Sequence, residues 1–364
     1  MSKTLVLGIE TSCDDTSVCL LEASENIRPK ILSIKTFSQD QILKKWGGVV
    51  PEIAARNHVM KLEPLMEECF VEAGKSPSDV NFIGVTAMPG LLGPLLTGLN
   101  GAKTLALLFK LPIVPVNHLY AHIEAIHLSE DIEYPYLGVI VSGGHSLFVL
   151  VDSPIDIEVI GTTIDDAAGE AFDKGGKILG LGYPAGKIID ERAQKGETGH
   201  YTFPIGLRDS KDSNLSYSGV KTSVRVMLEK EPDLLNDEVK MNNVCAAYQQ
   251  AIVDAIALKL KYALQIAKDK TTLKDLPIVV GGGVAANSGL RKTLGQKFQD
   301  VHFVEPQYCT DNAAMIAHFA WRARADWKIP FPQCLTIDAH SRMLSKDEVF
   351  QMARDRAHHL KDKR

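Results

Sequence analysis

Two stretches of the chain share one pattern, in which two apolar runs are joined by a short polar turn. In residues 137–151 the runs flank Ser-Gly-Gly at 142–144, whose glycines supply the backbone freedom that a tight turn needs. The same pattern occurs in residues 5–21, where the polar turn is longer. Each stretch predicts a buried β-hairpin, and two such hairpins predict an internally duplicated chain.

Between and after the hairpins, short apolar runs alternate with segments of helical spacing. The runs predict strands over residues 82–86, 111–116, 157–160, 277–281 and 301–304. The helical spacing predicts helices over residues 52–73, from about 95 to 109, from 165 to 176, over 243–268 and from 309 onward. Residues 195–225 form the least regular region. This alternation is typical of α/β proteins.

The chain has 364 residues, which exceeds the size at which one hydrophobic core normally keeps growing. Two lobes of about 150 residues each are therefore expected. We place the first lobe at residues 1–135 and the second at 136–310. Residues 311–364 are expected to form a C-terminal helical segment that packs back on the first lobe.

The composition excludes some classes of protein. With 45% hydrophobic and 23% charged residues and no apolar run near 18 residues, we expect a globular protein without a membrane span. The net charge of −5 predicts no global attraction to nucleic acid, so any RNA contact is expected to be local. The six cysteines form no C-x-x-C pair and resemble reduced thiols of an intracellular protein. The first predicted strand begins almost at Met1, so a targeting peptide is either missing or removed.

A histidine pair is the first candidate for chemistry. His118 and His122 are four residues apart in a segment that predicts a helix, so both imidazoles can reach one metal ion. A coincidental pair in a core or on a surface is the alternative. Leu119 stands where a His-Glu-x-x-His metalloprotease has its general base, which argues against a peptidase.

Other polar positions leave both structural and functional roles open. Asp165 or Asp166 is predicted to cap the following helix, and Asp311 lies at or near the start of another. The glycines at 281–283 end a buried strand, which is where ligands approach open α/β sheets. In the irregular region, Arg208, Lys211, Lys221 and Arg225 suit either a phosphate backbone or a solvated loop.

The order of these signals resembles the duplicated, two-lobed fold of actin-like proteins, sugar kinases and heat-shock chaperone ATPases, which have a nucleotide cleft between the lobes. The exact strings resemble the tRNA threonylcarbamoyladenosine transferases, once labelled glycoprotein endopeptidases. These strings cover residues 8–16, 117–122, 141–145, 164–174, 282–287 and 309–315. The resemblance spans roughly residues 4–325.

Within that family, residues 46–58 are similar to the bacterial and mitochondrial branch, and the chain looks most like the fungal mitochondrial member. That member is implied to act as a homodimer in the mitochondrial matrix without accessory subunits; the bacterial cytoplasm is the alternative. Met88 and Pro94 depart from the bacterial pattern and fit a changed partner surface. Tyr120 and Ala121 also replace the usual residues between the histidines.

The resemblance implies a donor, threonylcarbamoyl-AMP, made by a separate upstream enzyme, and tRNA as the acceptor. It implies that residues 141–145 hold the donor: Val141, Ser142, Gly143, Gly144 and His145. Residues implied to hold the nucleoside part are Asp173, Gly186, Asp190 and Asn287.

The resemblance also implies one divalent ion per chain, bound by His118, His122 and Asp311. This set of two imidazoles and one carboxylate permits iron or zinc and does not choose between them. Asp14, in the turn of the first hairpin, is the candidate for deprotonating the acceptor amine or orienting the donor. Glu10 and Asp15 are acids nearby.

The function expected from this resemblance is transfer of the threonylcarbamoyl group to the adenosine beside the anticodon of tRNAs that read codons beginning with adenine. Two alternatives belong to other classes. One is an ATP-hydrolysing kinase or chaperone-like machine of the same superfamily. The other is a non-catalytic scaffold that holds a structural metal and binds tRNA or a partner.

Overall fold

The computed structural model describes residues 3–344 and 348–349. It divides into two compact units. Unit 1 contains residues up to 130, residues 154–156 and the described residues from 311 onward; unit 2 contains residues 131–153 and 157–310. Among the described residues, no helix is both long and apolar enough to cross a membrane.

Each unit contains a five-stranded sheet, and both sheets have the same order of strands. The order is β3-β2-β1-β4-β5 in unit 1 and β8-β7-β6-β9-β10 in unit 2. In each sheet a hairpin pairs antiparallel, and its first strand also pairs in parallel with a later strand. This repeated topology confirms the predicted duplication and the α/β class.

The strands of unit 1 are β1 (Thr4–Glu10), β2 (Thr16–Ser24), β3 (Ile27–Phe37), β4 (Phe82–Met88) and β5 (Ile113–Asn117). Its helices are α1 (Asp40–Leu43), α2 (Pro51–Ala73), α3 (Leu92–Phe109), α4 (His118–Glu124) and α11 (Ala313–Trp327). Single 3-10 turns are η1 (Pro77–Asp79), η2 (Ala125–Leu128) and η5 (Gln333–Thr336).

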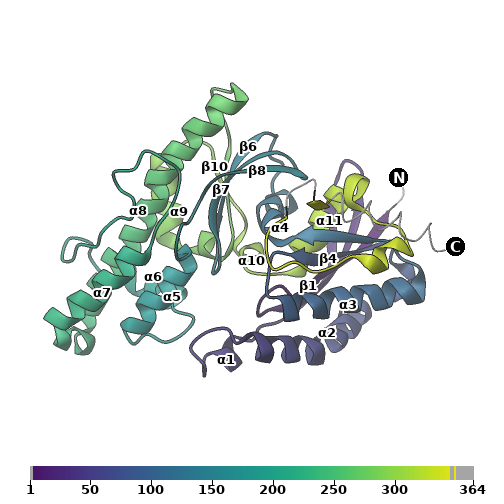
Figure 1. Cartoon of the computed structure of the whole chain (residues 1–364), viewed down its shortest axis with the longest axis horizontal. Helices are drawn as coiled ribbons and strands as arrows, with labels where there is room; N and C mark the ends of the chain where they lie inside the picture. The colour runs from purple at the N-terminus through teal and green to yellow at the C-terminus, as the bar shows by residue number, and fades with distance from the viewer. Residues whose placement is uncertain (1–2, 345–347, 350–364) are drawn as a thin grey trace. The chain divides into compact units, whose positions relative to one another are not determined.

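Helices cover both faces of the first sheet. Successive residues of β1 point to opposite faces, so neighbouring residues of this strand contact different helices. A Cβ atom at Gly8 would lie 2.3 Å from the Ala313 carbonyl oxygen, so α11 packs directly against the backbone there. Its neighbour Ile9 lies near Gly98 of α3, on the other face. Gly84 of β4 is covered by α11 in the same way as Gly8. In Figure 1, α2 and α3 lie on one side of the sheet and α11 on the other.

The strands of unit 2 are β6 (Tyr136–Val141), β7 (Ser146–Ser153), β8 (Asp156–Thr162), β9 (Ile278–Gly281) and β10 (Val301–Phe303). Its helices are α5 (Ala168–Ile178), α6 (Gly186–Ala193), α7 (Ser218–Lys230), α8 (Glu238–Thr271), α9 (Ser288–Lys297) and α10 (Pro306–Cys309). Its 3-10 turns are η3 (Pro232–Asn236) and η4 (Gly283–Ala286). The long helix α8 packs against α6, α9, β6 and β7.

The structure corrects several predicted elements. Strand β3 was not predicted, because its residues are mostly half-buried or exposed and three of them are basic: Arg28, Lys30 and Lys35. Helix α7 lies inside the region predicted to be the least regular. Helix α8 begins five residues earlier than predicted, since the Asp237 side chain accepts from the Lys240 amide as its N-cap.

Candidate metal centre

Two elements of unit 1 bring the candidate ligands together. β5 runs directly into α4, and the Asn117 side chain caps that helix by accepting from the amides of Leu119 and Tyr120. The cap fixes His118 as the first helical residue, and His122 follows one turn later on the same face. Asp311 immediately precedes Asn312, the actual N-cap of α11.

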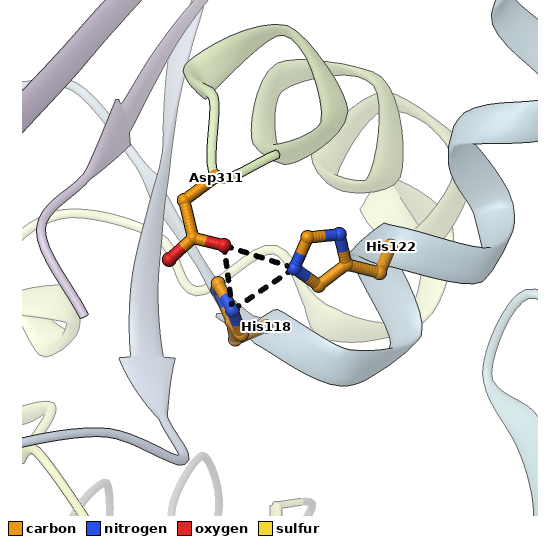
Figure 2. Close-up of side chains that lie close together, drawn as sticks. All are labelled: His118, His122 and Asp311. Carbon is orange, nitrogen blue, oxygen red and sulfur yellow. Dashed lines mark hydrogen bonds and ion pairs between the residues drawn. The ribbon is translucent and has the colours of Figure 1, made fainter. Parts of the chain in front are cut away.

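The three side chains converge on one point (Figure 2). His122 Nε2 lies 3.1 Å from His118 Nε2 and 3.1 Å from Asp311 Oδ1. The third edge of the triangle, from His118 Nε2 to Asp311 Oδ1, is 3.5 Å. Both histidines are buried, whereas the Asp311 side chain is 20% exposed.

These edges match the spacing of ligands around a metal ion. Ligand atoms about 2.0–2.1 Å from zinc are about 3.3–3.4 Å apart in a tetrahedron, and adjacent ligands of an octahedral ion are about 3.0 Å apart. The observed edges of 3.1 to 3.5 Å lie close to both values. The triangle therefore fits a divalent ion and favours neither zinc nor iron.

Protons alone cannot make all three edges attractive. If only one histidine carries a proton on Nε2, the lone pair of the other faces the Asp311 carboxylate, at 3.1 Å for His122 or at 3.5 Å for His118. If both histidines carry one, two N–H groups face each other at 3.1 Å. A cation at the centre attracts all three atoms at once, so the residues fit a metal.

A buried carboxylate fixes the orientation of His118. Glu10, at the end of β1, places Oε2 3.0 Å from His118 Nδ1. Ser12 Oγ also lies 3.1 Å from Nδ1. The Glu10 carboxylate in turn accepts from Thr86 Oγ1 at 2.6 Å and from the Ser12 amide at 2.5 Å. A proton on Nδ1 leaves the Nε2 lone pair for a metal, as in carboxylate–histidine–metal groups.

Charge within the cluster sets the pKa values of the metal-free chain. Burial works against the imidazolium of His118, but Asp311 and Glu10 outweigh it and raise its pKa well above the usual value. Burial and the charge on His118 lower the pKa of His122. Burial works against the carboxylate of Asp311, yet the two histidines hold its pKa well below the usual value.

The turn of the first hairpin carries two unusual acids. Burial raises the pKa of Asp14 to about 6, and the charge of Asp311 adds to this increase. Burial and the charge of Asp14 raise the pKa of Asp15 to about 8. Asp15 Oδ1 is buried without a hydrogen-bond partner in the described part of the chain. Both acids therefore titrate closer to neutral pH than a free aspartate does.

In unit 2, the predicted donor-binding residues lie at the tip of the second hairpin. The Ser142 amide donates to the His145 carbonyl at 2.8 Å, which closes the turn that follows Val141. A Cβ atom added to Gly143 or Gly144 would meet nothing within 4 Å, so open space lies beside both residues. The backbone of this turn is therefore accessible to a ligand.

Two glycines from other segments of unit 2 pack against the base of that turn. A Cβ atom at Gly169 of α5 would lie 2.7 Å from the Ser142 carbonyl oxygen. One at Gly282, whose φ is +91°, would lie 2.5 Å from the Val141 carbonyl oxygen. The hairpin tip, the start of α5 and the glycines after β9 therefore meet at one place.

The predicted nucleoside-binding residues form hydrogen bonds that link their helices. Asp173 of α5 accepts from the Ala185 amide at 2.8 Å, next to Gly186 at the start of α6. Asp190 of α6 accepts from both the amide and the hydroxyl of Ser288. Asn287 caps α9. Through these contacts α5 is joined to the start of α6, and α6 is joined to the start of α9.

Asp165 and Asp166 do not cap α5 as predicted, because its N-cap residue is Ala167. Asp165 instead accepts from the Tyr217 amide at 2.7 Å, so it caps α7 from 52 residues away. Asp166 forms ion pairs with Lys174 and Lys221 at 2.6 and 2.7 Å. Lys221 therefore lies on helix α7 and pairs with Asp166, so the expected solvated loop is wrong for this residue, and a contact with a phosphate backbone stays a prediction.

Lys259 of α8 is fully buried and holds the loop before α7. Its Nζ donates to the carbonyl and the hydroxyl of Ser210, both at 2.8 Å, and to the Asp212 carbonyl at 3.2 Å. Sequence reasoning missed this residue, because its contacts lie almost 50 positions away. Glu10 was noted only as a nearby acid for the same reason, since its partner is 108 positions away.

Met88 and Pro94 are buried, so neither can itself form a partner surface. Their side chains belong to the interior of unit 1, at the end of β4 and the start of α3. These two departures are therefore internal, and a changed partner surface near residues 88–94, where Leu92 is exposed, stays a prediction.

Solved structures define the class of the fold. HypF from T. kodakarensis is similar with a TM-score of 0.55 and 12% identity, covering 89% of this chain and 48% of that chain. Component A of the Acidaminococcus fermentans (R)-2-hydroxyglutaryl-CoA dehydratase is similar with a TM-score of 0.52 and 14% identity. The match covers 89% of this chain and 100% of that chain. With the duplicated sheets, these neighbours place the chain in the actin-like fold class, which confirms the predicted duplicated α/β fold; the nucleotide cleft stays a prediction.

The family follows from the sequence comparisons. The family model described as tRNA N6-adenosine threonylcarbamoyltransferase matches residues 30–318, and this chain belongs to that family. A relative of that name from Thermosipho africanus is 44% identical over 319 residues, covering 86% of this chain and 92% of the relative. A relative of the same name from Streptococcus pneumoniae is 40% identical over 320 residues, covering 87% of this chain and 92% of the relative. The predicted family is confirmed.

Proposed function

We propose that this chain transfers the threonylcarbamoyl group of threonylcarbamoyl-AMP to N6 of the adenosine beside the anticodon, in tRNAs that read codons beginning with adenine. The observation that carries the proposal is the triangle of His118, His122 and Asp311, found in a member of this transferase family. Its three ligand atoms fit a divalent ion and leave coordination positions for a substrate.

The reaction needs an activated donor, because the lone pair of the adenine amine is delocalised into the ring. A bond forms between N6 and the carbamoyl carbon, the bond from that carbon to the phosphate oxygen breaks, and AMP leaves with the electron pair. N6 loses one proton. The protein must therefore hold a mixed anhydride, accept a proton and stabilise negative charge on the departing phosphate.

The metal site has one role in this scheme. A divalent ion held by the two imidazoles and Asp311 supplies Lewis acidity that neutralises charge on the donor. Glu10 keeps His118 in the tautomer that can bind it. Iron and zinc both suit this set of ligands.

Unit 2 supplies the donor site in this proposal. The open space beside Gly143 and Gly144 supports contact between the hairpin backbone and the donor's phosphate, since glycine lets an anion come close to backbone N–H groups. Asp173, Gly186, Asp190 and Asn287 are proposed to hold the nucleoside part, and the hydrogen bonds that join α5 to α6 and α6 to α9 support one common site.

Asp14 is the proposed proton acceptor. A general base works best when its pKa lies near the operating pH, and the pKa of about 6 for Asp14 meets this condition. Asp15, with a pKa of about 8, would be mostly protonated at neutral pH and suits donation of a hydrogen bond instead.

We further propose a homodimer in the mitochondrial matrix, supplied with donor by a separate enzyme, and a lobe organisation of residues 1–135, 136–310 and 311–364.

Exposed apolar side chains on α2 support an association surface for the proposed homodimer. Met60 and Val71 are 61% and 75% exposed and lie on one side of the helix, because 11 residues make about three turns. Light scattering of the wild type and of the Met60→Asp variant tests the dimer.

The experiment that tests the function uses purified protein, unmodified tRNA and threonylcarbamoyl-AMP, with mass analysis of the digested nucleosides. Threonylcarbamoyladenosine in the digest is the expected result. A second reaction includes bacterial accessory subunits. Product that forms only there would contradict independent activity, and no product in either reaction would overturn the transferase assignment.

A further inference from the structure

A short chain of hydrogen bonds in unit 2 runs from α9 to α8 through Asn287. Asn287 Oδ1 accepts from the backbone amide of Leu290 at 2.9 Å. Asn287 Nδ2 then donates to Gln249 Oε1 at 2.8 Å. Gln249 and Asn287 are only 7% and 9% exposed, so both amides are largely removed from water.

The direction of this chain of bonds is fixed at its first link. The two ends of an asparagine amide look alike, but a backbone N–H can only donate. Leu290 therefore requires the oxygen of Asn287 on its side, and the nitrogen of Asn287 must face Gln249. Gln249 must accept with its side-chain oxygen, because two facing NH₂ groups would repel each other.

Gly289 leaves the space that this contact needs. A Cβ atom at Gly289 would lie 2.5 Å from Gln249 Nε2 and 3.1 Å from its Cδ. The same atom would lie 3.3 Å from Asn287 Oδ1. A side chain at this position would therefore push Gln249 away from Asn287.

The two bonds use half of the hydrogen-bonding capacity of the Asn287 amide. An amide has two N–H donors and two oxygen lone pairs. One N–H is taken by Gln249 and one lone pair by Leu290, so one donor and one acceptor remain for a ligand. Adenine and ribose both present groups that pair with a donor and an acceptor.

We infer that Gln249 is a positioning residue, which orients the Asn287 amide so that its free donor and acceptor meet the nucleoside of the donor. The inference rests on the proposed donor site. Gln249 acts only through Asn287, so its loss weakens nucleotide binding by turning or loosening that amide.

Neighbouring contacts hold Gln249 in place. Tyr248, the preceding residue of α8, donates its hydroxyl to the Ala171 carbonyl of α5 at 2.6 Å. A Cβ atom at Gly175 would lie 2.3 Å from that hydroxyl, so α5 and α8 are in close contact. Helix α8 therefore contacts both α5, which carries Asp173, and Asn287.

The test measures the dissociation constant of AMP by calorimetry with the full chain. The variant Gln249→Met keeps the length of the side chain and removes the acceptor, whereas Gln249→Glu keeps an oxygen toward Asn287. We expect Gln249→Met to weaken AMP binding by about three- to tenfold, as for loss of one buried hydrogen bond, and Gln249→Glu to retain most of the affinity. Gln250→Met, one position along α8, is the matched control and should bind like the wild type.

A double-mutant cycle with Asn287→Ala separates positioning from a general loss of structure. If Gln249 acts through Asn287, Gln249→Met should cause no further loss in the Asn287→Ala background. Additive losses in the two variants, or normal AMP binding by Gln249→Met, would overturn the inference while Asn287→Ala still supports the donor site. If the wild type binds no AMP, the proposed donor site fails and the inference fails with it.

Discussion

His118 Nδ1 lies 3.0 Å from Glu10 Oε2, so a histidine at the start of α4 is held by a carboxylate at the end of β1. Both side chains are buried, and Glu10 also accepts from Thr86 and Ser12. This arrangement leaves His118 Nε2 pointing toward His122 and Asp311. The orientation of one candidate metal ligand is therefore fixed by the protein itself.

We predict that Glu10→Gln weakens metal binding by about tenfold, near the lower end for loss of a carboxylate partner. The amide can still accept from Nδ1 but carries no charge to polarise the imidazole. Competition with a chromogenic chelator measures the affinity. The exposed Glu67→Gln on α2 is the control, and equal affinities of the two variants would contradict the role of Glu10.

His118→Ala should remove the metal and the transferase activity but leave the protein folded. Two ligand atoms remain in this variant, too few to retain the ion during purification. Elemental analysis gives the stoichiometry, and circular dichroism checks the fold. His200→Ala, which alters an exposed histidine of unit 2, should keep both the metal and the transferase activity. A His118→Ala protein with full metal content would disprove the ligand assignment.

Asp15 should make the metal-free protein less stable as the pH rises. Its pKa is raised from 3.8 to about 8, so the folded state holds a proton that the unfolded state releases above pH 4. Stability is therefore lost progressively between about pH 4 and pH 8. The amide of Asp15→Asn mimics the protonated acid and removes this dependence.

Chemical denaturation of chelator-treated protein measures this effect. From pH 5 to pH 8.5, the stability advantage of Asp15→Asn over the wild type should grow by about 1–3 kcal/mol, a range discounted for solvent screening. Asp326→Asn, at an exposed position of α11, serves as the control. A constant difference between Asp15→Asn and the wild type would show that Asp15 ionises normally.

Lys259→Met should destabilise unit 2 by about 1 kcal/mol, because half-buried Ser210 and exposed Asp212 lose the hydrogen bonds that the buried Lys259 ammonium donates. The loop should also become more sensitive to proteolysis within residues 206–214. Lys261→Met lies on the exposed side of the same helix and should change neither property. Cleavage rates that are equal in the two variants would disprove the anchoring role.

The sequence was most informative where local pattern determines structure. The hairpins β1/β2 and β6/β7 follow from apolar alternation around a polar turn, and their repetition gave the duplicated fold. The spacing of His118 and His122 placed both on one helical face. These relationships extend over a few residues, so no tertiary contact is needed to predict them.

Long-range contacts could not be predicted in this way. Asp165 has the residue type and position of a cap for α5, yet it caps α7, because the loop before α7 returns to the same place. Strand β3 is half-buried at the edge of its sheet and lacks a continuous apolar run. The Glu10–His118 contact joins residues far apart in sequence, and spacing alone gives no sign of it.

The position of α11 has a consequence for synthesis on the ribosome. This helix covers Gly8 and Gly84 of the first sheet, yet it is translated after the whole of unit 2. We expect unit 2 to complete its fold while the sheet of unit 1 still exposes the apolar surface that α11 will cover. The newly made chain would then need protection from aggregation until α11 leaves the exit tunnel. A chain that stops short of Asp311 would lack both this cover and the carboxylate of the metal site.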